Sequence, residues 1–113
     1  MKSAIKYKCP CGYIHDGDNA PVACPKCGAP GDRFVKLDEA AAQLVESSRK
    51  TNMFHTQIIS LAREIEAVCG QGIADNLDPG CVSVFQKTLA ASYDMMKLSM
   101  TELQGHMSKG KWG

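Results

Sequence analysis

Two pairs of cysteines, each followed by a glycine, place the strongest constraint on how this chain folds. The first pair is Cys9 and Cys11 in KCPCG, and the second is Cys24 and Cys27 in CPKCG. Four thiolates in two close pairs are the soft, tetrahedral ligand set that suits iron or zinc. The glycine after each pair permits a positive φ, so that backbone N–H groups turn toward sulfur and offset its charge. The sequence therefore predicts one metal ion held by these four cysteines.

The charge and hydropathy of the chain indicate which partners and which cellular compartment to expect. The 113 residues carry a net charge of +1, and no block of like charges or aromatic-studded basic patch indicates a nucleic-acid partner. No apolar run approaches the roughly 20 residues of a membrane span, and MKSAIKYKCP lacks the apolar stretch of a signal peptide. We therefore expect a cytoplasmic protein with no membrane partner. Because the cytosol keeps thiols reduced, the six cysteines of this chain are poor disulfide candidates.

The sequence pattern changes near Asp38, from a loop-rich region to one with helical periodicity. Residues 1–37 are rich in loops and too few to bury a stable core alone, so a structural metal would contribute folding free energy. Beyond them, apolar residues recur at intervals of three and four, which predicts helices at about 38–69 and 79–108, with Asp38 as the first N-cap. The segment GQGIADNLDPG is expected to form the turn. The predicted fold class is a small metal-bound β-ribbon and knuckle domain at 1–37, followed by an all-α helical hairpin at 38–113.

Each predicted helix carries an apolar stripe that is wider than one partner helix can cover. A homodimer that closes a four-helix bundle would cover both stripes, and a monomeric hairpin leaning on the metal domain is the alternative. The stripe residues are Leu37, Ala41, Leu44, Ser48, Thr51, His55, Ile58, Ala62, Ile65 and Cys69, flanked by Phe54, Leu61 and Val68, and then Val82, Phe85, Leu89, Ser92, Met96, Ser99, Leu103 and Met107.

The first region resembles a rubredoxin domain of the short kind found at the end of rubrerythrins. The resemblance covers about a third of the chain and is carried by Tyr7 two residues before the first cysteine, GYIHDG after the second, Ala20-Pro21, CPKCG and Phe34. It implies one iron on the four cysteines. It also implies a small aromatic core of Tyr7, Tyr13 and Phe34, with His15 on a surface turn away from the metal.

The chain departs from this family in its first knuckle, where Pro10 alone separates the two cysteines instead of two residues. A shorter knuckle closes a smaller chelate ring, and its proline removes one possible N–H donor. Fewer N–H to sulfur bonds disfavour the extra negative charge of a ferrous site and lower its potential, although strain could act in the opposite direction. The rest of the domain keeps its spacing. We therefore interpret the site as tightened rather than broken.

An iron site with four thiolates carries one electron and has no open position for substrate. The sequence thus favours a small non-haem iron protein whose helical hairpin dimerises and docks a redox protein partner. The alternative is a zinc-stapled structural or interaction module without a redox role, since the same thiolates hold Zn²⁺ equally well.

A second metal site in the helices has weaker support. Rubrerythrins would place a di-iron site there, yet the helices contain no Glu-x-x-His, so peroxidase chemistry loses its main support and we expect no enzyme of that kind. Glu102 and His106 are four residues apart on one face, and the hairpin would bring Glu46 across from them. These three residues form a candidate weak metal site, and a solvated polar end of the bundle is the alternative.

Other helical residues with reactive or metal-binding side chains have ordinary explanations. His55 is expected to be a buried, hydrogen-bonded histidine rather than a haem ligand. Cys69 and Cys81 flank the turn and would either meet as a redox pair or remain inert thiols. Five methionines are expected to be adaptable core packing, namely Met53, Met95, Met96, Met100 and Met107.

Overall fold

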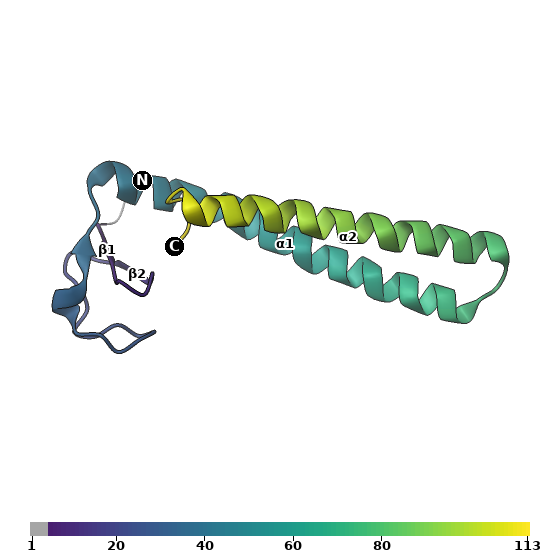
Figure 1. Cartoon of the computed structure of the whole chain (residues 1–113), viewed down its shortest axis with the longest axis horizontal. Coiled ribbons are helices and arrows are strands. Elements are labelled where there is room, and N and C mark those ends of the chain that lie inside the picture. The colour runs from purple at the N-terminus through teal and green to yellow at the C-terminus, as the bar shows by residue number, and fades with distance from the viewer. Residues whose placement is uncertain (1–4) are drawn as a thin grey trace. The chain divides into compact units, whose positions relative to one another are not determined.

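The computed structural model describes residues 5–113 and contains three short strands and two long helices (Figure 1). In chain order the elements are β1 (Lys6–Lys8), β2 (Ile14–Asp16), a 3₁₀ helix η1 (Gly31–Arg33), β3 (Val35–Lys36), α1 (Glu39–Asp75) and α2 (Pro79–Ser108). They form two compact units, one comprising the chain up to Lys50 with Met107–Gly113, and the other Thr51–His106. Among the helices described, none has the length and apolar character needed to cross a membrane.

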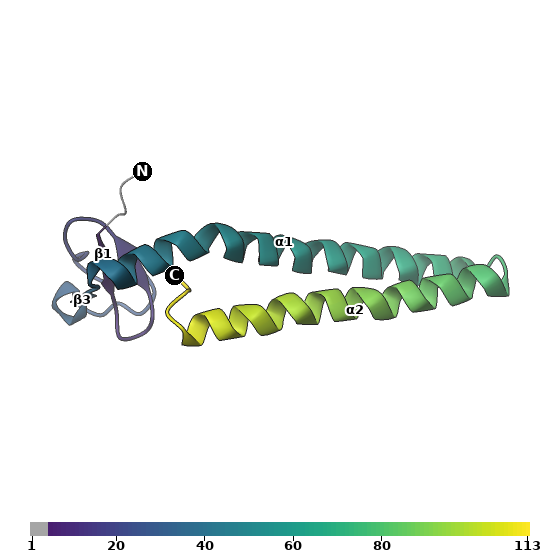
Figure 2. The same ribbon diagram turned by 90° about the horizontal axis from the view of Figure 1, so that it is seen from above.

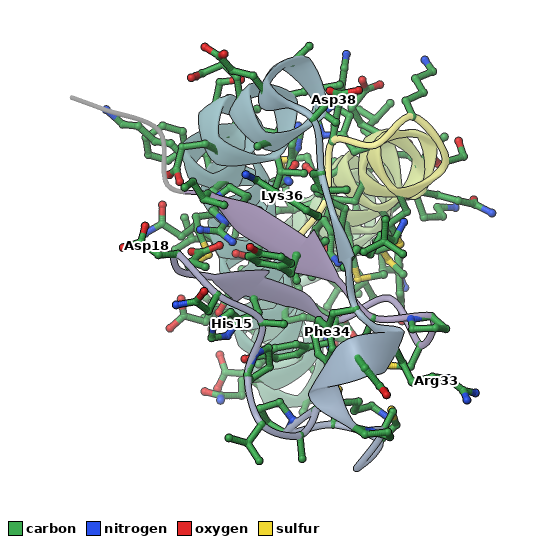
Figure 3. The ribbon with its side chains drawn as sticks, turned by 90° about the vertical axis from the view of Figure 1, so that its left-hand side faces the viewer. His15, Asp18, Arg33, Phe34, Lys36 and Asp38 are labelled. Atoms are coloured by element: carbon green, nitrogen blue, oxygen red, sulfur yellow. The ribbon has the colours of Figure 1, made fainter. Side chains whose placement is uncertain are left out.

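The first unit is built on a three-stranded antiparallel sheet in the order β2-β1-β3. In the register of the sheet, Tyr7 of β1 lies opposite His15 of β2 and Lys36 of β3. Phe34 directly follows η1 and is labelled in Figure 3. Phe34 is buried together with two of the cysteines, and Tyr7 and Tyr13 pack against this cluster. The expected aromatic core is thus confirmed. The placement of His15 on a turn was wrong, because it lies within β2.

A buried ion network joins the sheet to the first turns of α1. The Lys6 side chain is fully buried, and its Nζ lies 3.0 Å from Asp16 Oδ1 and 2.8 Å from Glu46 Oε1. Arg49 also pairs with Asp16, and it donates to the Gly113 carbonyl at 2.7 Å. Because a buried ammonium is tolerated only when it is paired, these contacts explain why the first compact unit extends into α1 as far as residue 50.

Helix α1 begins as predicted and ends later than predicted. Asp38 Oδ1 accepts a hydrogen bond from the Ala41 N–H at 2.8 Å, which confirms the N-cap. The predicted end near residue 69 was wrong, because the helix continues to Asp75. Gly72 lies inside the helix, where a Cβ would come within 2.4 Å of the Phe85 ring. This glycine therefore allows close helix packing, and the turn is confined to residues 76–78.

Helix α2 starts at Pro79 and ends at Ser108, as the periodicity predicted. Asp78 caps it by accepting a hydrogen bond from the Cys81 N–H at 2.7 Å, and Pro79 suits the first helical position because no N–H partner is needed there. In both Figure 1 and Figure 2 the two helices run side by side in opposite directions. The predicted helical hairpin is therefore present.

The contact between the helices uses part of the predicted stripe, because Ala62, Cys69, Ser92, Ser99 and Leu103 are buried as predicted. The predicted contact residues Ile58 and Ile65 are exposed, and so are most of the methionines assigned to the core, namely Met53, Met95, Met100 and Met107. The residues that are buried in this second unit are mostly small or polar: Asn52, Ala62, Cys69, Ser92, Ser99, Leu103 and His106. Small side chains let the helix backbones approach closely, so that larger apolar residues of the predicted α2 stripe, such as Phe85 and Leu89, are only half-buried.

We predict that Asp16→Asn lowers the free energy of unfolding by roughly 1 kcal/mol at pH 7, a value reduced for the partial exposure of this carboxylate. Hydrogen bonding by Arg49, helped by Lys6, lowers the pKa of Asp16 to about 2. A carboxyl whose folded-state pKa is depressed stabilises the fold above its ordinary pKa, and the contribution disappears as the pH falls toward the folded value.

Urea denaturation of both proteins between pH 7 and pH 3 checks this prediction. The difference between wild type and variant should shrink as the pH falls below about 4, and metal loss at low pH cancels because both proteins share it. Asp32→Asn, which makes the same change at an exposed position, is the control. A difference that is constant with pH would contradict the assignment.

Candidate metal centre

The four predicted cysteine ligands converge. The Sγ atoms of Cys9 and Cys27 are 3.6 Å apart, those of Cys11 and Cys24 are 3.7 Å apart, and all four lie within 4.8 Å of one another. A tetrahedral ion with metal–sulfur distances of about 2.3 Å would place its sulfurs about 3.8 Å apart. In the described range 5–113, this is the one group of three or more His, Cys, Asp or Glu whose ligand atoms gather closely enough for a metal. The donor set fits iron or zinc.

The two knuckles present the thiols through tight turns that require glycine. The Gly12 N–H bonds to the Cys9 carbonyl at 2.8 Å, and the Gly28 N–H bonds to the Cys24 carbonyl at 2.9 Å. The two glycines have φ values of 103° and 78°, in the left-handed region that other residues rarely adopt. The predicted positive φ of these two glycines is confirmed.

The four cysteines differ in their exposure to solvent. Cys9 and Cys24, the first residue of each knuckle, are buried, whereas Cys11 and Cys27 are exposed. Each buried thiol lies under its own knuckle beside the Phe34 cluster. One side of the site is therefore shielded by protein, and the other reaches solvent.

Backbone N–H groups act unequally on the two buried thiols. At Cys24, burial raises the pKa, but hydrogen bonds from the N–H groups of Cys27 and Lys26 and from neighbouring thiols bring it down to about 7. At Cys9, one N–H, that of Cys11, lowers the pKa, and burial together with the other thiols outweighs it and raises the value to about 12. The second knuckle thus stabilises negative charge on its buried sulfur better than the first.

The difference in the number of backbone N–H donors follows from the length of each knuckle. Between Cys24 and Cys27 the chain has a proline and then Lys26, whose N–H is one of the two donors. Between Cys9 and Cys11 it has only Pro10, which has no N–H. The expected loss of one donor in the short knuckle is therefore present in the structure, and the four sulfurs still converge.

The residues of the candidate second metal site have other partners. His106 Nε2 lies 3.5 Å from Glu102 Oε2, and its Nδ1 lies 2.6 Å from Asn52 Oδ1. Glu46 belongs to the other compact unit, where it pairs with Lys6. A metal site that joins Glu46 to Glu102 and His106 remains a prediction.

His55 is hydrogen-bonded, as expected. Its Nδ1 lies 3.0 Å from Ser99 Oγ, and its ring meets the His106 ring edge to face, with centroids 6.1 Å apart. Together with Asn52 these residues form a polar layer in the seam between α1 and α2. Their spacing along each helix was visible in the sequence, but the pairing of Asn52 with His106 was not predicted.

The two remaining cysteines are free thiols. Cys69 is buried in the seam, and Cys81 is half-buried in the first turn of α2. Hydrogen bonding to Asp78 raises the pKa of Cys81, with further contributions from burial and from the charge of Asp75. A raised pKa keeps this thiol protonated at neutral pH, which favours the inert alternative over a reactive redox pair.

Comparison with known proteins agrees with this geometry. Residues 7–35 match the family model described as the rubrerythrin, rubredoxin-like domain. The chain is also 30% identical over 80 residues to reverse rubrerythrin-1 of Clostridium acetobutylicum. That match covers 70% of this chain and 39% of the relative, so the chain spans well under half of the relative's length. Among solved structures, nothing matches the chain at a significant level.

The match to the relative is longer than the metal-binding region, so it extends into the helical part of the chain. The family model, in contrast, ends at residue 35, just before α1. It includes all four converging cysteines, both glycines of the knuckles and the aromatic residues packed beside them. The N-terminal part of this chain is therefore a rubredoxin-like domain of the rubrerythrin kind, and a helical hairpin follows it.

Proposed function

We propose that this protein is a small iron protein that carries one electron on its rubredoxin-like domain. The observation that supports the proposal is the convergence of four cysteine sulfurs at tetrahedral spacing, which leaves no coordination position for substrate. Iron bound by four thiolates exchanges a single electron between its ferrous and ferric states. A site without an open position suits transfer of an electron better than chemistry on a bound molecule.

The residues around the sulfurs support this role in two ways. Burial of Cys9 and Cys24 beside the aromatic cluster excludes water from one side, and their N–H donors offset thiolate charge. Exposure of Cys11 and Cys27 brings two ligands to the surface, where an electron has a short path to a partner. The domain therefore combines a fixed, shielded site with an exposed edge.

A redox protein is the proposed partner, and the exposed side of the knuckles is where it would dock. Beside the first knuckle, a shallow groove is lined by Lys8, Cys9, Pro10, Val35 and Leu37. Val35 is 66% exposed, which is unusual for a valine on a strand. An apolar surface next to a metal ligand suits a transient contact that brings two redox centres close together.

The test of this proposal is the full chain produced with iron in the medium and purified without oxygen. We expect one iron per chain, a visible thiolate-to-iron absorption, and its reversible loss on reduction by one electron. Cys11→Ser should lose the metal and unfold the N-terminal metal-binding region while the helices persist, because that region has a small core. Cys81→Ser, which changes a cysteine outside the cluster, is the matched control.

Three results would contradict the proposal or a part of it. A colourless protein that takes up zinc and refuses iron would support the zinc-stapled interaction module instead. A Cys11→Ser variant with full metal affinity and an unchanged spectrum would show that the short knuckle supplies no ligand. Two or more additional metal ions per dimer would point to a separate site in the helices.

We predict that one residue inserted between Pro10 and Cys11 raises the reduction potential of the iron protein. The insertion restores a two-residue knuckle and a second backbone N–H near Cys9 Sγ, as the longer knuckle already provides at Cys24. One hydrogen bond to a charged sulfur, worth roughly 1.4 kcal/mol, corresponds to a shift of about 59 mV for one electron.

Voltammetry of the two iron proteins at one pH and salt concentration measures this shift. Pro10→Ala, which keeps the short spacing, is the companion variant and separates the effect of spacing from that of the proline ring. A potential that falls on insertion would show that strain in the short knuckle, not donor number, sets the natural value. An unchanged potential would show that the missing donor has no electronic effect.

A further inference from the structure

Eight large apolar side chains of the second unit are exposed along two stripes, which we call the apolar face. In α1 they are Phe54, Ile58, Leu61, Ile65 and Val68, and in α2 they are Val84, Met95 and Leu98. Their exposure ranges from 36% for Ile65 to 73% for Leu98. Isolated exposed apolar residues are common on protein surfaces, but a continuous set at helical spacing indicates a binding surface.

Both stripes lie on the same side of the hairpin. Each stripe residue directly precedes a residue at the contact between the helices, as Leu61 precedes the buried Ala62 and Leu98 precedes the buried Ser99. In an antiparallel pair of right-handed helices, positions that precede the contact positions face the same direction. A groove lined by both stripes confirms this geometry, since Leu61 and Ile65 meet Val84 across it.

The seam between the two helices is a poor hydrophobic core. Of the residues buried in the described part of this unit, Leu103 is the single large aliphatic one, and the others are serine, asparagine, histidine, alanine or cysteine. A hairpin with so little buried apolar area gains little from folding alone, because each buried methylene contributes only about 0.8 kcal/mol.

We propose that the apolar face binds the same face of a second copy of this chain, so that two hairpins form a four-helix bundle. The α1 stripe repeats at intervals of four and three residues, the spacing at which helices of a bundle interlock. The α2 stripe has the same spacing when Thr88 and Ala91, which lie between Val84 and Met95, are included. The similar length and character of the two stripes make the face complementary to itself, as a two-fold interface requires. The dimer core is thus intermolecular, and the small, polar seam is intramolecular.

The size and charge of the face fit a second copy. Eight large side chains that are about half exposed offer an area of the same order as the roughly 800 Å² per partner of a stable interface. Neither stripe contains a lysine or arginine, whereas helices that lie on a membrane surface carry a basic rim. Two exposed carboxylates accompany the stripes. Glu64 lines the groove between them, and Glu102 continues the α2 stripe beyond Leu98, so it would lie at the end of the interface.

Sedimentation velocity of the full chain loaded with zinc tests this inference, and zinc makes the result independent of the redox proposal. We expect a dimer at micromolar concentration. Leu98→Glu and Leu61→Glu should each weaken dimerisation by roughly 100-fold or more, because each places two charges in an apolar interface. Met100→Glu and Met53→Glu change exposed residues outside the stripes and should leave the dimer unchanged.

Circular dichroism and metal content of each variant show whether the monomers remain folded. A wild-type chain that stays monomeric at 100-fold higher concentration would overturn the inference, as would equal weakening by the Met and Leu variants. Binding of a monomeric chain to phosphatidylcholine vesicles, abolished by Leu98→Glu, would also overturn it, because the face would then serve a lipid surface.

Discussion

Mutual repulsion among four thiolates within 4.8 Å of one another is the constraint on which the N-terminal unit depends. Four negative charges at that separation are unfavourable unless a cation lies among them and backbone N–H groups point at the sulfurs. Besides the cysteines, the described part of this unit buries only Lys6, Phe34 and, in the first turns of α1, Ala42, Val45 and Ser48. Metal binding and folding of this domain are thus one equilibrium, and the identity of the metal decides whether the site is redox-active or only structural.

A second electrostatic arrangement connects this domain to the helices. Lys6 is fully buried in the strand that leads to the first knuckle, and Asp16 and Glu46 neutralise it from β2 and α1. The start of α1 is therefore part of the metal-binding unit. Beyond residue 50 the hairpin depends on different interactions, with close polar contacts in the seam and an exposed apolar face that we propose binds a second copy.

Features that depend on residues close together in the chain could be predicted from the sequence, and contacts between distant residues could not. The convergence of the four cysteines, the positive φ of the two glycines and the cap at Asp38 were predicted from motifs of a few residues, and the structure confirms them. The end of α1 was wrong because Gly72 was interpreted as a turn former, whereas it makes room for a side chain of the other helix. The buried Lys6 and the pair of Asn52 with His106 join residues distant in sequence, and no local pattern indicates them.

The most direct test of the central claim is X-ray absorption at the metal edge of the full-length protein. If one ion is held by Cys9, Cys11, Cys24 and Cys27, the first shell contains four sulfurs at about 2.3 Å and no lighter atom. The same result is expected with iron or zinc, because the protein provides the same four sulfurs to either ion. A first shell with three sulfurs and a nitrogen or oxygen would contradict the account, since the short knuckle would then fail to deliver both of its cysteines to the metal.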